Sequence, residues 1–173
     1  QEIRVIRDQD ELKHLIIGGR KVPLINVSEA LDLSILDQLE RHYATELATA
    51  EISYQGFEDT LDILKHFKFA VFKVQKHETY NWEIFRIEAD NGSEKYIKEL
   101  LSGRLEKRGD KDIVQSRYTV EYLRIIEKIL NHVAKGRKHL ADIKIKFATG
   151  KPLRLDLETY PLSATIYIAP RMD

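Results

Sequence analysis

The sequence predicts an α+β domain built from a duplicated β-α-β-β-β unit, in which a strand and a helix are followed by three strands. This order occurs between residues 49 and 101 and again between residues 116 and 168. Length and composition agree with it, because 173 residues with 43% hydrophobic side chains suffice for one ordinary core. A supersecondary unit that repeats over so long a period is typical of a pseudo-symmetric domain rather than a small solenoid.

The composition excludes several classes of protein. Lys and Arg number 28, as do Asp and Glu, so the formal net charge is +0 and any DNA contact must come from a local patch. The absence of Cys excludes disulfides, thiolate zinc sites and a cysteine nucleophile. No apolar run approaches the roughly 20 residues that span a bilayer, and no signal peptide opens the chain. We therefore expect a cytoplasmic protein that does not bind membranes. High charge of both signs with a single Met also resembles a heat-adapted composition.

The first expected element is a β-hairpin over residues 2–22. Residues 8–10 and the pair Gly18-Gly19 supply turns, and Gly-Gly is a favoured hairpin pair. A two-stranded hairpin is marginal by itself and needs a sheet to join. Since no earlier strands precede it, we expect the chain to begin inside a domain.

Residues 23–48 are expected to begin extended and to become helical. The segment 22–27 is apolar and contains a proline, which favours extended chain. From Ser34 onward apolar residues recur at helical spacing, and Asp37 stands where a capping box needs its acidic side chain. A helix is therefore predicted from near Ser34 to about Leu47.

Each copy of the repeated unit is expected to begin with a strand that leads into an amphipathic helix. The strands are residues 50–54 and 116–119. The apolar residues at helical spacing are Phe57, Leu61, Leu64 and Phe67 in the first helix, and Leu123, Ile126, Ile129 or Leu130, and Val133 in the second.

Three strands are expected after each helix. They are residues 69–75, 82–89 and 94–101 in the first copy, and residues 143–147, 153–157 and 165–168 in the second. Gly92 and Gly103 mark turns, and residues 106–111 are expected to form a charged hairpin tip between the copies.

Several segments, in the same order along the chain, resemble one protein family. They are residues 22–28 (VPLINVS), 116–123 (SRYTVEYL), 151–158 (KPLRLDLE) and 165–171 (TIYIAPR). These segments are similar to the connector, the last helix and the C-terminus of proliferating cell nuclear antigen, the DNA polymerase sliding clamp, of the archaeal type. The resemblance covers the whole chain but only roughly the last two-thirds of a family member.

The resemblance implies a DNA-clamp fold and a division of the chain. Residues 1–22 would be the terminal strands of a truncated N-terminal clamp domain, residues 23–48 the interdomain connector, and residues 49–173 the C-terminal clamp domain. In the family, three subunits close into a ring, with antiparallel sheets outside and helices on the inner face. Because a ring with part of a domain missing cannot close normally, we expect this chain alone to be a monomer or a dimer.

The resemblance also implies that cations on the two helices face double-stranded DNA. Such cations would contact phosphates and would not read sequence. Against this, Asp59 and Asp62 stand on the first helix where basic residues would be expected. Acidic residues early and basic residues late are also what any exposed helix gains from its dipole. The residues expected to face DNA are Lys65, Arg124, Lys128 and Lys135.

A partner pocket and a subunit interface follow from the same resemblance. Short peptides of DNA polymerase, the clamp loader, flap endonuclease and DNA ligase would dock in an apolar pocket beside the connector. Edge strands 12–20 and 94–101 would pair between subunits. The residues expected in the pocket are Leu24, Ile25, Val27, Pro152, Tyr167, Ala169 and Pro170. Those expected in the interface are Leu15, Ile17, Tyr96 and Lys98.

Signals for other chemistry are missing from the sequence. It has no phosphate-binding Gly loop and no His-Glu-x-x-His motif, and two carboxylates such as Asp59 and Asp62 seldom suffice for a metal. We therefore expect no cofactor, no metal and no enzymatic activity.

The expected function is that of a sliding clamp subunit, a processivity factor that encircles DNA and tethers replication and repair enzymes, associated with the nucleoid if archaeal. The alternative is a clamp-related interaction module that binds partners without encircling DNA; a hydrolase or nuclease using the acidic helix face is third. Charge geometry separates them. A clamp gathers Lys and Arg on the helical face, whereas a nuclease gathers carboxylates in a cleft.

Overall fold

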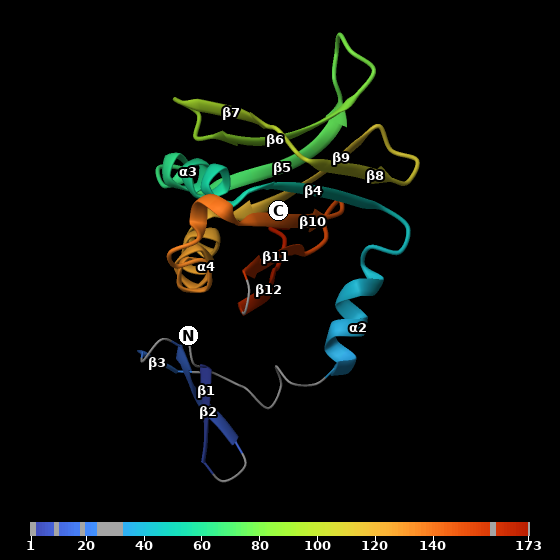
Figure 1. Ribbon diagram of the computed structural model, residues 1–173. Coiled ribbons are helices and arrows are strands. Elements are labelled where there is room, and N and C mark those ends of the chain that lie inside the picture. The colour runs from blue at the N-terminus through green and yellow to red at the C-terminus, as the bar shows by residue number, and fades with distance from the viewer. Residues whose placement is uncertain (1–2, 9–10, 18–19, 24–32, 160–161, 173) are drawn as a thin grey trace. The chain divides into compact units, whose positions relative to one another are not determined.

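The computed structural model describes residues 3–8, 11–17, 20–23, 33–159 and 162–172. The chain divides into two compact units, Gln1–Arg41 and His42–Asp173, and each is described by itself (Figure 1). The expected domain boundaries after residues 22 and 48 remain a prediction.

The described residues of the first unit form a three-stranded antiparallel sheet and one helix. The strands follow in the order β1 (Ile3–Asp8), β2 (Glu11–Ile17) and β3 (Arg20–Pro23), which confirms strand pairing in the opening segment. The expected turn residues 9–10 and 18–19 lie outside the described residues. Helix α2 (Leu33–Arg41) confirms the helix predicted from near Ser34. It ends before the expected Leu47, because Leu47 begins the next strand.

Two antiparallel sheets and two main helices make up the second unit. The five-stranded sheet has the order β12 (Leu162–Ile168), β11 (Leu153–Thr159), β10 (Asp142–Phe147), β4 (Leu47–Ser53) and β8 (Arg104–Arg108). The four-stranded sheet has the order β7 (Lys95–Leu100), β6 (Glu83–Asp90), β5 (Phe69–Lys76) and β9 (Ile113–Thr119). The helices are α3 (Tyr54–Leu64) and α4 (Val120–Val133), and a short 3-10 helix, η1, covers Lys138–Leu140.

The predicted duplication is present, with one strand added. The first copy runs from β4 through α3 to β5, β6 and β7, and the second runs from β9 through α4 to β10, β11 and β12. The expectation of a hairpin tip at residues 106–111 was wrong, because β8 pairs with β4 and the chain reverses only after Arg108. The charged residues of β8 gave no strand pattern in the sequence. Edge strands commonly carry such charges, which block further pairing. Leu105 is half-buried and packs against the core, so it marks the face of β8 that points inward.

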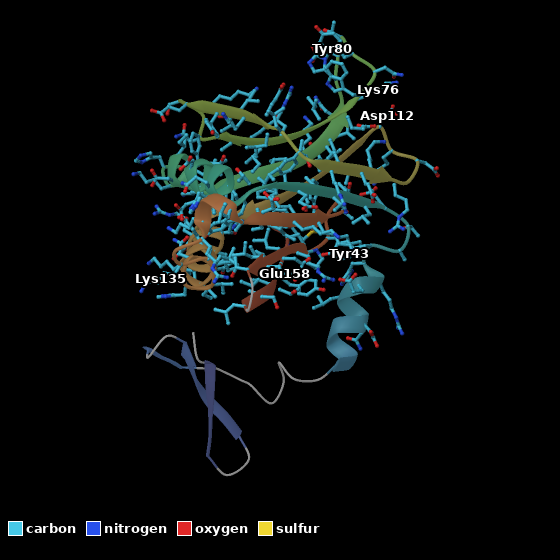
Figure 2. The ribbon with its side chains drawn as sticks, in the orientation of Figure 1. Tyr43, Lys76, Tyr80, Asp112, Lys135 and Glu158 are labelled. Atoms are coloured by element: carbon cyan, nitrogen blue, oxygen red, sulfur yellow. The ribbon has the colours of Figure 1, made fainter. Side chains whose placement is uncertain are left out.

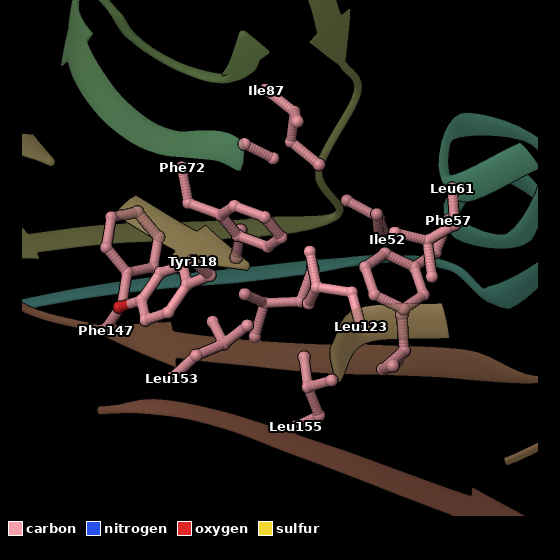
Figure 3. Close-up of a cluster of buried hydrophobic side chains, with 14 of the residues drawn as sticks. Ile52, Phe57, Leu61, Phe72, Ile87, Tyr118, Leu123, Phe147, Leu153 and Leu155 are labelled. Carbon is pink, nitrogen blue, oxygen red and sulfur yellow. The ribbon is translucent and has the colours of Figure 1, made fainter. Parts of the chain in front are cut away.

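The core lies where the inner faces of the two sheets meet (Figure 3). Alternate residues of β5 are buried, as expected for strands with one covered face. The ring of Phe72 lies 5.4 Å from that of Tyr118, in an edge-to-face arrangement, and 6.2 Å from that of Phe147 on the other sheet. The Tyr118 hydroxyl donates a 2.8 Å hydrogen bond to the Lys151 carbonyl, so its polar end is satisfied.

Helices α3 and α4 contact each other, and each buries one face and exposes the other (Figure 1). The Ser53 hydroxyl caps α3 by accepting a 3.0 Å hydrogen bond from the Gly56 amide. The Tyr54 hydroxyl donates to the Asn131 side chain and so ties α3 to α4. Within the described part of the chain, no helix is long and apolar enough to cross a membrane.

Candidate nucleic-acid interface

A basic cavity of about 710 Å³ lies between the end of α3 and the part of α4 from Val120 to Lys128. Five of its lining side chains are cationic, and Glu121 is the one carboxylate among the described residues that line it. This is a formal excess of four positive charges in a chain whose formal net charge is +0. The basic residues of the cavity are Lys65, Lys68, Arg124, Lys128 and Arg171.

Backbone hydrogen bonds bring these residues together. Phe69, at the start of β5, is paired with Thr119 at the end of β9. The Val120 amide donates a 2.9 Å hydrogen bond to the Lys68 carbonyl, so the segment after α3 is held against the first turn of α4. Because Arg124 and Lys128 are four residues apart on a helix, they share a face.

Three of the four cations expected to face DNA line this one cavity: Lys65, Arg124 and Lys128. Lys135 does not line it and lies exposed beyond the end of α4 (Figure 2). Lys68 and Arg171 also line the cavity but were not among the cations expected to face DNA; Lys68 follows α3 and Arg171 follows β12.

Acidic residues lie close to the cavity, as the carboxylates of the first predicted helix led us to expect. Asp62 is 3.7 Å from Lys65, in a solvent-exposed ion pair. Burial raises the pKa of the Glu127 carboxyl, and the neighbouring Arg124 partly opposes this by favouring the charged form. Glu58 pairs with Lys138 at 2.9 Å. Among the described residues, no group of three or more His, Asp or Glu is placed to hold a metal ion.

A second cavity, apolar and of about 250 Å³, lies between α4 and β12. Tyr167 and Ala169, both expected in the partner pocket, line it together with described residues of α4. The residues that line this apolar cavity are Tyr122, Ile125, Ile126, Tyr167, Ile168 and Ala169.

Two described residues of the expected partner pocket, Pro152 and Pro170, are not among the residues that line this cavity. Pro152 is half-buried, and its carbonyl accepts a 2.7 Å hydrogen bond from the Tyr43 hydroxyl. Pro170 is half-buried at the end of the chain. The expected pocket residues Leu24, Ile25 and Val27 lie outside the described residues.

The expected subunit interface has one edge strand and one central strand. Strand β7 is at an edge of its sheet, with Tyr96 half-buried against the core and Lys98 exposed. Strand β2, which carries Leu15 and Ile17, is the middle strand of three. The expectation that this segment forms an edge was therefore wrong, because β1 and β3 take both of its sides.

Comparison with solved structures identifies the fold. A structure described as "C-terminal region of FEN-1 bound to A. fulgidus PCNA" matches with 19% sequence identity and a TM-score of 0.60 over 99% of this chain. PCNA from Thermococcus kodakaraensis matches with 18% identity and a TM-score of 0.55 over 95% of it. This chain spans 64% and 63% of those two chains. No family model and no curated protein matches the sequence. The chain therefore has the α+β DNA-clamp fold.

Proposed function

We propose that this chain is a DNA sliding clamp subunit, a processivity factor that encircles double-stranded DNA and tethers replication and repair enzymes. The observation that carries the proposal is the gathering of Lys65, Arg124 and Lys128 in one cavity between the exposed helices of a clamp-type fold. In a ring of three such subunits, the helices would line the hole and the sheets would face outward.

The physical demands of this role are modest. A closed ring stays on DNA by topology, so its cations need only hold phosphates loosely and need not read bases. Lys and Arg contacts to phosphates release counterions, which makes binding independent of sequence and sensitive to salt. The role needs no catalytic group, and we propose that the protein acts as a scaffold rather than an enzyme. The cavity cations meet the demand for phosphate contacts.

The triple variant Lys65→Gln, Arg124→Gln and Lys128→Gln tests this proposal. Binding of a labelled duplex would be followed by fluorescence anisotropy over a range of salt concentrations. Affinity falls as salt rises. Each lost phosphate contact should make this fall shallower, by about 0.9 in the slope of log affinity against log salt. The control removes three exposed cations outside the cavity, Arg104, Lys144 and Lys151, and should leave the slope unchanged. Equal slopes for the two triple variants would contradict the proposal.

We also propose that the C-terminal end of the chain docks peptides of partner enzymes. Tyr167 and Ala169 line an apolar cavity of the kind that accepts aromatic or aliphatic anchors, and the A. fulgidus PCNA structure holds the C-terminal region of FEN-1. DNA polymerase, the clamp loader and DNA ligase would use the same surface.

Calorimetric titration with a peptide from the C-terminal region of a flap endonuclease tests this docking. The wild-type chain should bind it, and Ala169→Glu should weaken binding about tenfold or more by placing a charge in the apolar cavity. The exposed Lys151→Glu is the control for the added negative charge. A folded wild-type chain that gives no binding heat would remove the tethering role.

The alternative function is a clamp-related module that binds partners without encircling DNA. The acidic residues of α3 favour it, since Asp59 and Asp62 lie exposed on the helix that would face DNA. This alternative predicts that the partner peptide binds while the two triple variants show the same salt slope.

A further inference from the structure

We propose that His77 is a pH-sensitive switch, which holds the tip of the β5–β6 hairpin closed while its imidazole is neutral and releases the tip when the imidazole is protonated. The hairpin tip consists of residues 77–82, which join β5 to β6. The inference does not rest on the proposed clamp function, because it uses only contacts within this hairpin.

The ring of His77 accepts two backbone hydrogen bonds. Its Nδ1 atom accepts from the Thr79 amide at 3.0 Å and from the Tyr80 amide at 3.2 Å. A backbone amide can only donate, so Nδ1 must present a lone pair and the ring proton must lie on Nε2. The His77 amide also donates a 2.8 Å hydrogen bond to the Trp82 carbonyl, which closes the base of the tip. The closed tip therefore requires the neutral form of His77.

The next turn of the chain has the same pattern of hydrogen bonds around a side chain that does not titrate. Between β6 and β7, the Oδ1 atom of Asn91 accepts from the Ser93 amide at 3.0 Å and from the Glu94 amide at 2.7 Å. Asn is common in such turns because its side-chain carbonyl takes the place of a backbone acceptor. In both turns the donors are the amides two and three residues further along the chain. His77 therefore fills the role of an Asn, with an acceptor that acid can remove.

Three aromatic rings pack together on the hairpin tip. The rings of Tyr80 and Trp82 are stacked, with centroids 4.2 Å apart and an angle of 8° between their planes. The His77 ring lies 4.9 Å from the Tyr80 ring and 5.9 Å from the Trp82 ring, measured between centroids. Tyr80 is 51% exposed and Trp82 is 55% exposed, and Figure 2 shows Tyr80 at the end of the hairpin. Because Tyr80 belongs to the backbone that His77 holds, release of that backbone would separate the stacked rings.

Protonation of the imidazole removes the acceptor. Histidine gains its charge between about pH 8 and about pH 5, and a proton on Nδ1 of His77 would face two N–H groups that already point at that atom. The two hydrogen bonds are therefore present at neutral pH and are lost as the pH falls.

Other titratable groups surround the hairpin tip without pairing with His77. Strand β9 lies beside β5 as far as Ile113, and Lys107 of β8 lies 3.7 Å from Glu83. Among the described residues, none of these groups forms an ion pair with His77, so no carboxylate holds the charged ring in place. The groups are Lys76, Glu78, Tyr80 and Glu83 on the hairpin, and Lys107, Arg108, Asp110, Lys111 and Asp112 at the end of β8 and in the turn before β9.

The test follows the near-ultraviolet circular dichroism of Trp82, the single Trp of the chain, from about pH 8 to about pH 5. Four forms of the full chain are compared: wild type, His77→Asn, His77→Ala and His66→Asn. The wild type should show one transition with the steepness of a single proton. His66 is an exposed histidine that follows α3, and His66→Asn should show the same transition as the wild type.

The two variants of His77 should each give one spectrum at every pH. His77→Asn should keep the spectrum of the neutral wild type, because its side-chain carbonyl accepts the same amides and does not titrate. His77→Ala should give the spectrum of the acidic wild type, because it has no acceptor. Far-ultraviolet circular dichroism of each form checks that the sheets are intact.

Three results would overturn the switch. They are a wild type without a transition, a transition that persists in His77→Asn, and a His77→Ala spectrum that matches the neutral wild type. Amide signals in a nuclear magnetic resonance titration supply an internal comparison. The signals of Thr79 and Tyr80 should move with the transition, whereas those of Ser93 and Glu94, bonded to Asn91, should stay. Equal movement of both pairs would also count against a switch confined to His77.

Discussion

Gly109 occupies a backbone conformation that residues with a side chain rarely adopt. Its φ is +112°, at the point where the chain reverses between β8 and β9. A Cβ atom added there would lie 3.1 Å from the Thr45 carbonyl oxygen and 3.4 Å from the Glu46 Cα, so the space is filled by backbone that cannot easily move. Both conformation and packing therefore require glycine at this position.

Replacing Gly109 by Ala should lower the free energy of unfolding by about 1–3 kcal/mol, the usual cost of a strained backbone conformation. Gly103→Ala is the matched control, because no atom lies within 4 Å of its added Cβ and its φ is not positive. That change should alter stability by about 0.5 kcal/mol or less. Urea unfolding of the two variants measures the difference, and equal stabilities would show that the turn tolerates a side chain.

At the scale of single residues, the sequence predicted only part of the basic cavity. Helical spacing placed Arg124 and Lys128 on one face, because four residues make about one turn. It could not place Lys68 or Arg171 beside them. Their positions depend on backbone bonds from Val120 to Lys68 and from Arg171 to Arg117, which join segments far apart in the chain.

At the scale of elements, prediction succeeded where the pattern was local and apolar. In α3 the expected residues Phe57, Leu61 and Leu64 are all fully buried, since a stripe at helical spacing is enough to define a buried face. In α4 the helical spacing did not decide whether Ile129 or Leu130 belongs to the buried face. The structure buries Leu130 and leaves Ile129 49% exposed, a choice set by how the helix rotates against the sheets.

Strand β8 was missed for a related reason. Its sequence, RLEKR, holds one apolar residue among charges, and local propensity treats such a run as a turn. Pairing with β4 makes it a strand, and that pairing joins residues more than fifty positions apart, such as Glu51 and Arg104. Tertiary pairing overrode the local pattern, as it often does at the edge of a sheet.

At the scale of the whole second unit, charge is segregated although the chain is formally neutral. The basic cavity and the apolar cavity are neighbours, because Ile125 lines both. The segment after β12 contributes to both cavities, since Ala169 lines the apolar cavity and Arg171 lines the basic cavity. The proposed partner-docking and DNA-binding surfaces are therefore adjacent on one short segment.

In a complete ring, we propose that β7, with Tyr96 and Lys98, pairs with a neighbouring subunit. This strand lies at a sheet edge and exposes Ile97, which is 46% accessible to solvent. An edge strand with an exposed apolar residue is suited to pairing with another chain. This chain spans 64% and 63% of the two PCNA chains that it resembles. Assembly into a ring is therefore a part of the proposed function.

The most direct test of the central claim, that DNA contacts the face of α3 and α4, is a lysine footprint. Lysines would be acetylated with and without duplex DNA at low salt and the modified peptides quantified by mass spectrometry. The proposal predicts that DNA protects Lys65, Lys68 and Lys128, which line the basic cavity, and leaves Lys144 and Lys151 as reactive as in the free protein. Protection of Lys144 and Lys151 with full reactivity at the cavity lysines would contradict it.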